Sequence, residues 1–472
     1  MKLKISISVF ANIVLLIMMG VFYALIGESD FFKEYGYYVV AIGSAVLLAI
    51  AFIELRKSNV GMLSFSCVFI LLLHIFSFGN FYLKALGLEE YYLFGDWFRS
   101  DRELKSASGY FALCTSEAIL IGILISLQKT RNHSCEYNLF LGLDEKATKR
   151  ILYRAGCILF AVTLPCRLYI DYTYILQSSL TGEYQGFSGM LGLADDLQTL
   201  FIPALICIMY GKRERVLFCK AILMIYTILC AFVMAASGSR RYYVTAILAI
   251  FLFYFNTKPN ADRKKHHNPF AAVGLIMAGI MVLNFMTMIR NYRHSVLGIL
   301  GIFQGHAEDL FSLDFLWESM SEFGLTGNVV YHSFKHFPSS VRFQYGFSYL
   351  ASFIYILPIG WLIHLEPSIG NILYNLTGSA VGGSLVADLY GNFGWFALFP
   401  AILLGYVISN ICYADKRIKK TSVKTAVSYA SCYSLINYVR SSTPEIMRYT
   451  AYTIISIYFL SMFLKHYESK GV

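Results

Sequence analysis

The sequence predicts an all-α integral membrane protein with about 12 transmembrane helices and one large outer (periplasmic) loop that carries interfacial helices. Three observations lead to this fold class. Hydrophobic residues make up 57% of the 472 residues and charged residues only 14%, whereas a soluble domain carries about 25% charged residues. Apolar runs of about 20 residues, long enough to cross a bilayer core, recur along the whole chain. Lysine gathers in every second connection between these runs, as expected for a chain that crosses a membrane repeatedly.

The apolar runs define the expected spans in chain order. The first run follows two lysines and lacks a small-residue cleavage site, so we expect a retained helix rather than a removed signal peptide. The expected spans are residues 5–26, 35–53, 60–78, 108–127, 151–170, 197–210, 216–236, 242–257, 269–289, 391–413, 424–440 and 449–465. The chain then divides into amino-terminal helices (1–236), two further spans (237–289), a large outer loop (290–390) and the last spans (391–472).

The lysine-rich connections predict the orientation of the chain. Basic residues are concentrated on the cytoplasmic side of a membrane protein. The lysine-rich connections are ELRKSN, residues 128–150, GKRERVLFCK, TKPNADRKKHHN and ADKRIKKTSVK, and both chain ends are lysine-rich as well. An even number of spans with both termini in the cytoplasm places all of these connections and both chain ends on the cytoplasmic side.

One apolar segment, residues 346–364, is long enough to be an additional span. If it crossed the membrane, the parity would invert and the later lysine-rich connection would face outward. The segment also contains Pro358, Gly360 and many aromatic residues. We therefore expect an interfacial or re-entrant piece on the outer surface, inside the large outer loop.

The basic residues expected on the outer side are mostly arginines. They are Arg99, Arg102, Arg167, Arg240, Arg241, Arg290, Arg293, Arg342, Arg440 and Arg448, against Lys33, Lys84, Lys105 and Lys335. A single arginine at a span end often extends to the lipid headgroups. A planar guanidinium, however, binds phosphate through two hydrogen bonds. Because the arginines near 240, 290 and 440 flank different spans, we expect them to face a lipid-linked phosphate or pyrophosphate together.

Four segments carry a resemblance to a known family. SGSRRYY (237–243) at the outer start of a span and IRNYRHS (289–295) at the start of the large loop are the first two. YGFSYLASFIYILP (345–358) and GGSLVADLYGNFGWFALFPAILLG (382–405) follow in the same order. This ordered set resembles the Wzy-type O-antigen and oligosaccharide repeat-unit polymerases. The resemblance implies a fold similar to that of GT-C-like polymerases and ligases.

The resemblance also implies a reaction and roles for residues. Such polymerases move a growing glycan from its undecaprenyl pyrophosphate to a new lipid-linked repeat unit at the outer face of the bacterial inner membrane. Arginines can stabilise the charge that develops on the leaving pyrophosphate. We expect Arg240, Arg290 and Arg293 in that catalytic role.

Other residues complete the expected site. Arg241, Arg440 and Arg342 are expected to bind substrate, and Tyr345 and Tyr390 to stack on sugar or polyprenyl. The acceptor hydroxyl needs a general base. The candidates are His294, Asp388, His332 and Glu322; each of them could equally be a structural hydrogen-bonding residue, and the sequence leaves the choice open.

We expect no metal ion and no cofactor. His332 and His336, four residues apart, are the nearest thing to a ligand pair, and Pro338 argues against a helix there. The ten cysteines contain no CxxC pair, which argues against a thiolate metal site. The expected partners are the lipid bilayer, a polyprenyl-pyrophosphate-linked oligosaccharide, a chain-length regulator and a flippase. Nucleic acid is not expected, because the basic residues are spread over many short loops.

Three alternative functions remain. A related ligase would use the same arginines to move a finished glycan to another acceptor. A lipid-to-sugar glycosyltransferase would place an acidic base in the first outer loop, where Glu28 and Asp30 lie, although that loop is very short. A flippase or transporter would show two similar halves, and the sequence has no such internal repeat.

Overall fold

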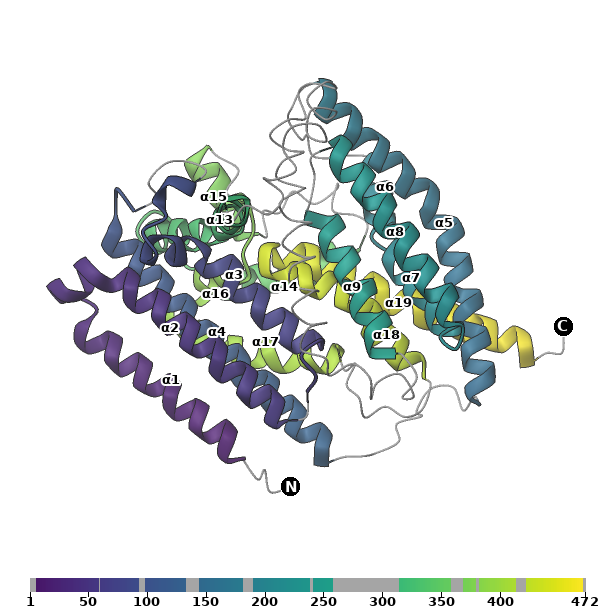
Figure 1. Ribbon diagram of the computed structural model, residues 1–472, viewed down its shortest axis with the longest axis horizontal. Helices are drawn as coiled ribbons and strands as arrows, with labels where there is room; N and C mark the ends of the chain where they lie inside the picture. The colour runs from purple at the N-terminus through teal and green to yellow at the C-terminus, as the bar shows by residue number, and fades with distance from the viewer. Residues whose placement is uncertain are drawn as a thin grey trace. The chain divides into compact units, whose positions relative to one another are not determined.

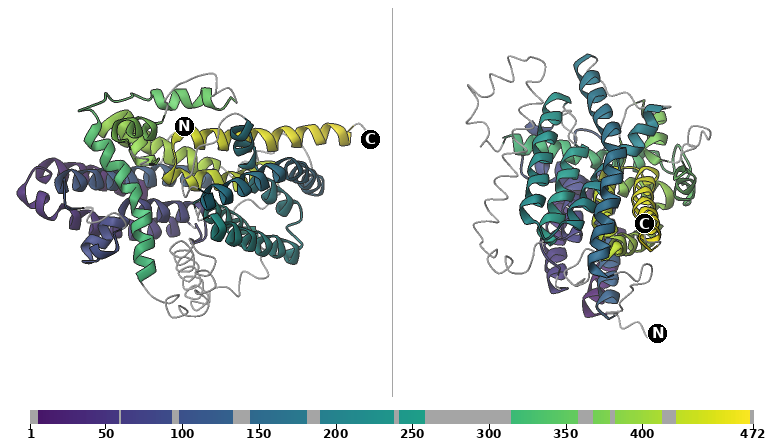
Figure 2. Two further views of the ribbon diagram at one scale, coloured as in Figure 1. Left: turned by 90° about the horizontal axis from the view of Figure 1, so that it is seen from above. Right: turned by 90° about the vertical axis from the view of Figure 1, so that its right-hand side faces the viewer.

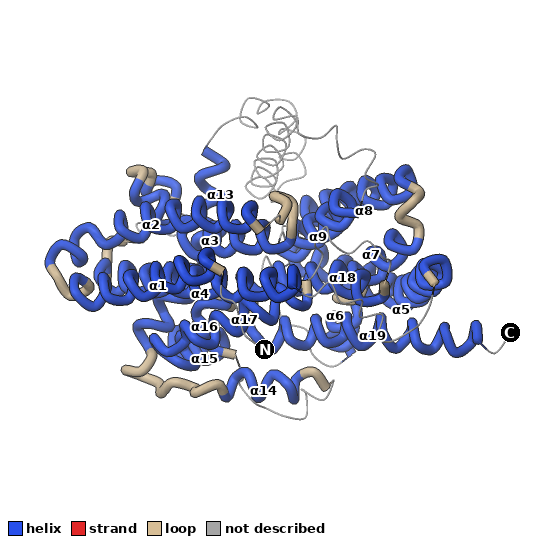
Figure 3. Tube along the Cα trace, turned by 90° about the horizontal axis from the view of Figure 1, so that it is seen from below, coloured by secondary structure: helices blue, strands red, loops and turns tan. Residues whose placement is uncertain are grey.

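The computed structural model describes residues 6–58, 60–92, 98–132, 144–180, 190–237, 241–257, 314–357, 368–378, 382–412 and 422–469. Within these ranges every regular element is a helix and no strand occurs (Figure 3). Nine helical segments of the described chain are long and apolar enough to cross a membrane. The described residues are therefore all-helical, as predicted, and consistent with a membrane protein, while the total of about 12 spans and the likeness to GT-C enzymes stay predictions.

The helices follow the expected spans closely. Eight of the candidate spans correspond to α1 Ile7–Ile26, α2 Asp30–Lys57, α3 Phe65–Ala85, α4 Arg102–Asn132, α5 Glu145–Leu180, α8 Val216–Ser237, α16 Leu385–Phe393 continued through η3 Gly394–Ala397 and α17 Leu398–Ile411, and α19 Thr443–Ser469. The ninth, residues 192–211, joins α6 Met190–Gln198 to α7 Phe201–Gly211. The expected spans at 242–257 and 424–440 form shorter helices, α9 Arg241–Thr257 and α18 Val423–Asn437. The expected span at 269–289 lies outside the described residues.

The chain forms two compact units, each built from separated stretches of sequence. Unit 1 consists of Met1–Tyr137, Met320–Lys416 and Ser434–Arg448. Unit 2 consists of Asn138–Ser319, Arg417–Tyr433 and Tyr449–Val472. The four segments expected from the sequence are consecutive along the chain and describe its path through the membrane. They stay a prediction.

Serine residues set where several helices of unit 1 begin. The side chains of Ser6, Ser29 and Ser64 accept a hydrogen bond from a backbone N–H in the first turn of α1, α2 and α3. Ser368 and Ser384 do the same for α15 Ile369–Thr377 and α16. A side-chain oxygen at this position replaces the partner that the first helical N–H groups lack.

Glycines allow α4 to pack closely against α17 inside unit 1. A Cβ atom on Gly122 would lie 2.0 Å from the carbonyl oxygen of Ile402, and one on Gly405 would lie 2.2 Å from that of Ile119. Small residues at such crossings let helix backbones approach in a membrane, where packing rather than the hydrophobic effect holds helices together. Because α2 also packs on α4 (Figures 1 and 2), α4 lies at the centre of this unit.

Part of the segment expected to form the large outer loop is a long helix, α13 Asp314–His336, which packs against α3. A Cβ atom on Gly79 would lie 2.5 Å from the carbonyl oxygen of Met320, and one on Gly324 would lie 2.5 Å from the backbone nitrogen of Asn80. The segment expected to be interfacial contains α14 Phe347–Tyr355. At 1.5 Å per residue this helix is about 14 Å long, too short to span a bilayer by itself.

Unit 2 contains α5, α6, α7, α8 and α9. Helix α5 contains Pro165 and packs against α7 through two glycines. A Cβ atom on Gly156 would lie 2.7 Å from the backbone nitrogen of Ile208, and one on Gly211 would lie 2.6 Å from Cβ of Tyr153.

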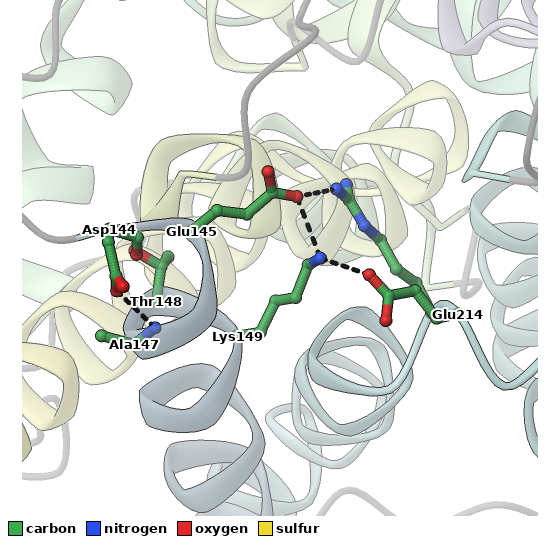
Figure 4. Close-up of polar contacts among 7 residues, drawn as sticks. Asp144, Glu145, Ala147, Thr148, Lys149 and Glu214 are labelled. Carbon is green, nitrogen blue, oxygen red and sulfur yellow. Dashed lines mark hydrogen bonds and ion pairs between the residues drawn. The ribbon is translucent and has the colours of Figure 1, made fainter.

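Ion pairs join two of the lysine-rich connections at one end of unit 2 (Figure 4). Lys149 in the first turns of α5 contacts Glu145 at 2.9 Å and Glu214 at 2.6 Å, and Arg213 contacts Glu145 at 2.7 Å. Asp144 accepts a hydrogen bond from the Ala147 N–H at 2.7 Å and so caps α5. The start of α5 and the turn between α7 and α8 therefore lie at the same end, as the alternation of lysine-rich connections predicts.

Candidate functional site

The SGSRR motif lies between two helices of unit 2. Helix α8 ends at Ser237 and α9 begins at Arg241. The expected catalytic residues Arg240, Arg290, Arg293 and His294 lie outside the described residues, as does the side chain of Arg241. Their roles stay predictions, and the described neighbours of the motif provide the available geometry.

Tyr243, the last residue of SGSRRYY, is tied to α5 by a hydrogen bond. Its hydroxyl donates to Oδ1 of Asp171 at 2.5 Å. The other carboxylate oxygen of Asp171 accepts from Nε of Arg167 at 3.0 Å. The Arg167 guanidinium lies over the Tyr243 ring, 4.5 Å from its centroid. The ion pair is largely shielded from solvent, with 8% of the Arg167 and 14% of the Asp171 side chain exposed.

The same network reaches α6. Nη1 of Arg167 donates to Oε1 of Gln198 at 3.1 Å, and Nε2 of Gln198 donates to Oδ1 of Asp195 at 2.5 Å. We call these five residues, Arg167, Asp171, Gln198, Asp195 and Tyr243, the α5–α9 network. It shows that Arg167, which the sequence grouped with the other outer arginines, is paired with a carboxylate inside the protein.

Asp388, one of the candidate bases, is buried in unit 1 and holds the start of α19. Its Oδ2 accepts hydrogen bonds from the backbone N–H and the hydroxyl of Thr443, both at 2.7 Å. The Thr443 hydroxyl also lies 2.8 Å from the hydroxyl of Tyr438. A carboxylate is favourable at a helix N-terminus, where N–H groups lack partners. This geometry gives Asp388 a structural role, and its role as a base stays a prediction.

Tyr390 lies in an aromatic cluster of unit 1. Its ring stacks on Phe334 of α13 with centroids 3.8 Å apart, and it makes edge contacts with Phe111 at 5.0 Å and Phe343 at 5.7 Å. In this arrangement protein rings cover Tyr390, which joins α16 to α13 and α4.

Tyr345 and Arg342 contrast with Tyr390 because both are exposed. The Tyr345 side chain is 77% exposed, while its backbone N–H donates to the carbonyl oxygen of Asn392 at 2.8 Å. The backbone of this segment is thus held against α16 while the ring is exposed, and its expected stacking on a sugar stays a prediction. Arg440 lies in η4 Tyr438–Arg440, and its guanidinium is 5.8 Å from the Phe76 ring centroid.

A polar cluster on α13 was not found from the sequence. Oδ2 of Asp101 accepts hydrogen bonds from the hydroxyl of Tyr331 and from Nζ of Lys335, the latter at 3.0 Å. Lys105 lies over the Tyr331 ring, 4.8 Å from its centroid. The Tyr331 hydroxyl, followed by Lys335, lowers the pKa of the Asp101 carboxyl. We call these four residues the α13 cluster.

The expectation that Pro338 prevents a helix around His332 and His336 was wrong. Helix α13 runs to His336, because a proline soon after a helix end is compatible with that helix. The two imidazole rings stack with centroids 6.2 Å apart. Burial, followed by His336 and Lys335, lowers the pKa of His332 to about 4. The spacing of His332 and His336 by four residues was the signal in the sequence that both lie on one face of a helix.

Among the described residues, no group of three or more His, Cys, Asp or Glu side chains has an arrangement that could hold a metal ion. The expectation that the enzyme needs no metal is untested, because the loop containing Arg290 and His294 lies outside those residues.

Comparison with known proteins identifies the family. No curated protein and no solved structure gives a significant match to the chain. The family model for O-antigen polysaccharide polymerase Wzy matches residues 7–470, nearly the whole sequence. The chain therefore belongs to the O-antigen polysaccharide polymerase Wzy family.

Proposed function

We propose that the protein polymerises undecaprenyl-pyrophosphate-linked oligosaccharide repeat units at the outer face of the bacterial inner membrane. The observation that carries this proposal is the match to the Wzy family over residues 7–470. The helices long enough to cross a membrane support it, because a lipid-linked substrate must be met in the bilayer. A chain-length regulator and a flippase are the proposed partners.

The proposed step is a glycosyl transfer. A hydroxyl at the non-reducing end of the incoming repeat unit attacks the anomeric carbon of the growing glycan. The bond from that carbon to the pyrophosphate oxygen breaks, the polyprenyl pyrophosphate leaves, and a base takes the hydroxyl proton. Negative charge develops on the leaving group, and fixed cations directed at such charge are a strong source of rate enhancement.

Arg240, Arg290 and Arg293 are the proposed ligands of the leaving pyrophosphate, with Arg241 and Arg440 in support. Three arginine side chains can neutralise a group with two or more negative charges without a metal ion. We therefore propose that turnover continues in the presence of a chelator. Exposed Arg342 and Tyr345 are proposed to contact the glycan. The base is proposed among His294, His332, Glu322 and Asp388.

The α5–α9 network supports the choice of the SGSRR motif. Asp171 lies about 39 Å farther along α5 than Glu145, at 1.5 Å per residue. The network therefore lies in the carboxy-terminal half of α5, far from the ion pairs of the lysine-rich connections at its start. This separation is expected if the motif faces outward and both chain termini lie in the cytoplasm.

The test uses purified protein in vesicles with a synthetic polyprenyl-pyrophosphate repeat unit. We expect a ladder of polymer, and Arg240→Ala should slow chain growth about a hundredfold, equivalent to about 3 kcal/mol. Arg240→Lys should recover part of the rate, because lysine keeps the charge and loses the planar fork. EDTA should leave the wild-type rate unchanged.

The matched control is Arg99→Ala, since Arg99 is exposed and in a different connection. It should polymerise at nearly the wild-type rate. A single transfer without a ladder would indicate a ligase, and movement of substrate without new glycosidic bonds would indicate a flippase. A full-length ladder from Arg240→Ala at a normal protein level would show that Arg240 is not part of the site.

A further inference from the structure

The α5–α9 network contains a hydrogen bond from Tyr243, a residue that follows the SGSRR motif closely in the sequence. Tyr243 follows Arg240 by three residues and Arg241 by two, and lies in the first turn of α9. Its hydroxyl is held by Asp171 of α5 at 2.5 Å. Its ring is covered by the Arg167 guanidinium at 4.5 Å. The first turn of α9 is therefore held against α5 by both the hydroxyl and the ring face of Tyr243.

We propose that Asp171 and Tyr243 are positioning residues that orient the SGSRR arginines, and that Arg167 serves as the counter-ion of Asp171 rather than as a ligand of pyrophosphate. The proposal rests on the function proposed above. It gives roles to three residues of the α5–α9 network, two of which, Arg167 and Asp171, lie outside the SGSRRYY segment.

The bonding of Asp171 explains why this residue is the centre of the arrangement. Each of its two oxygens is used, Oδ1 by Tyr243 and Oδ2 by Arg167. A carboxylate with little exposure to water is stable only beside a cation, and Arg167 lies one helical turn away on the same face of α5. Arg167 thereby pairs with the Asp171 carboxylate, and a charged acceptor forms a strong hydrogen bond with the Tyr243 hydroxyl.

The position of the first turn matters because groups that stabilise a transition state must be held accurately. Misplacing such a group by about 1 Å can cost a large factor in rate. Arg241 is the first residue of α9, and Tyr243 lies two residues later in the same turn. Without the hydroxyl, the ring can shift over Arg167, and the arginines are then presented less accurately to the leaving group.

The experiment is a double-mutant cycle between Tyr243→Phe and Arg240→Lys, measured as chain growth by purified protein. In the wild-type background Tyr243→Phe should lower kcat per folded molecule about tenfold, with KM changing less than about twofold. In the Arg240→Lys background the same substitution should lower kcat less than about twofold, because an imperfectly matched cation gains less from exact placement.

Tyr210→Phe is the matched control. Tyr210 is also a buried tyrosine of unit 2, in α7 beside the lysine-rich connection. It should leave kcat per folded molecule unchanged.

Two results would overturn the proposal while leaving the proposed function intact. One is a wild-type polymer ladder with an unchanged kcat for Tyr243→Phe, which would make the network purely structural. The other is a full tenfold loss in both backgrounds, which would mean that Tyr243 acts independently of Arg240. A wild-type protein that forms no glycosidic bonds would instead refute the proposed function itself.

Discussion

Units 1 and 2 each contain a carboxylate that accepts hydrogen bonds from a tyrosine hydroxyl and from a basic side chain. In the α5–α9 network of unit 2, Asp171 accepts from Tyr243 and Arg167. In the α13 cluster of unit 1, Asp101 accepts from Tyr331 and Lys335. In both, the cation also lies over the tyrosine ring, at 4.5 Å for Arg167 and 5.6 Å for Lys335.

The two clusters differ in burial, and burial decides their energetics. The side chains of Arg167 and Asp171 are 8% and 14% exposed, whereas those of Lys335 and Asp101 are 47% and 41% exposed. An ion pair in water contributes up to about 1 kcal/mol. Removing one partner of a buried pair leaves a charge that solvent cannot stabilise. We therefore expect the loss of one partner to cost more stability in the α5–α9 network than in the α13 cluster.

The largest effect should come from breaking the buried pair. We expect Asp171→Ala to lower the free energy of unfolding by about 3–5 kcal/mol, because Arg167 remains buried without a counter-charge. The measurement is the melting temperature of the purified protein in detergent, together with its level in the membrane.

Replacing both charged side chains with apolar ones distinguishes the effect of the charges from the effect of the volume that the side chains fill. The double substitution Arg167→Met with Asp171→Leu should recover part of the stability lost in Asp171→Ala, because apolar side chains of similar size can replace a buried pair. A wild-type melting temperature for Asp171→Ala would show that water reaches Arg167 and that the two clusters are alike.

The tyrosine hydroxyl of the exposed cluster should matter less. Tyr331→Phe removes the hydrogen bond to Asp101 and should lower stability by about 1 kcal/mol, because water can replace the lost donor. Thermal unfolding in detergent measures it, with Tyr345→Phe as the control, since Tyr345 is exposed. A loss for Tyr331→Phe as large as that for Asp171→Ala would contradict the comparison.

The exposed ion pair should contribute less still. Lys335→Met should lower stability by less than about 1 kcal/mol, and the difference from wild type should shrink in 1 M salt, where the screening length is about 3 Å. Melting curves at low and high salt test this. If the difference persists at high salt, Lys335 has a role other than its pairing with Asp101.

Stability should also depend on pH through the histidine beside the α13 cluster. Burial lowers the pKa of His332 from 6.5 to about 4, with smaller effects from His336, Lys335 and Lys105. Between those two values the unfolded chain binds more protons than the folded chain. His332 should therefore reduce stability as pH falls from about 6.5 to about 4. Melting temperatures of wild type and His332→Gln over this range should diverge, with the variant less sensitive; parallel curves would exclude His332 as the titrating group.

Some features of the candidate site were accessible from sequence and others were not. Arg167 and Asp171 are four residues apart in a predicted helix, and this spacing places them on one face. Tyr243, however, is separated from Asp171 by 72 residues, and Tyr331 from Asp101 by 230. Nothing in the local pattern of either tyrosine identifies its carboxylate partner.

The sequence alone determined the membrane-spanning helices, the alternation of lysine-rich connections and the family. These follow from local physical chemistry, because each apolar run must bury its own backbone polar groups in a helix to cross a bilayer. Only the tertiary structure decided that α13 packs on α3 through Gly79 and Gly324, and that Asp388 is engaged by Thr443. Those contacts depend on which helix faces meet. The sequence of a membrane helix does not identify those faces, because its residues are apolar on nearly every side.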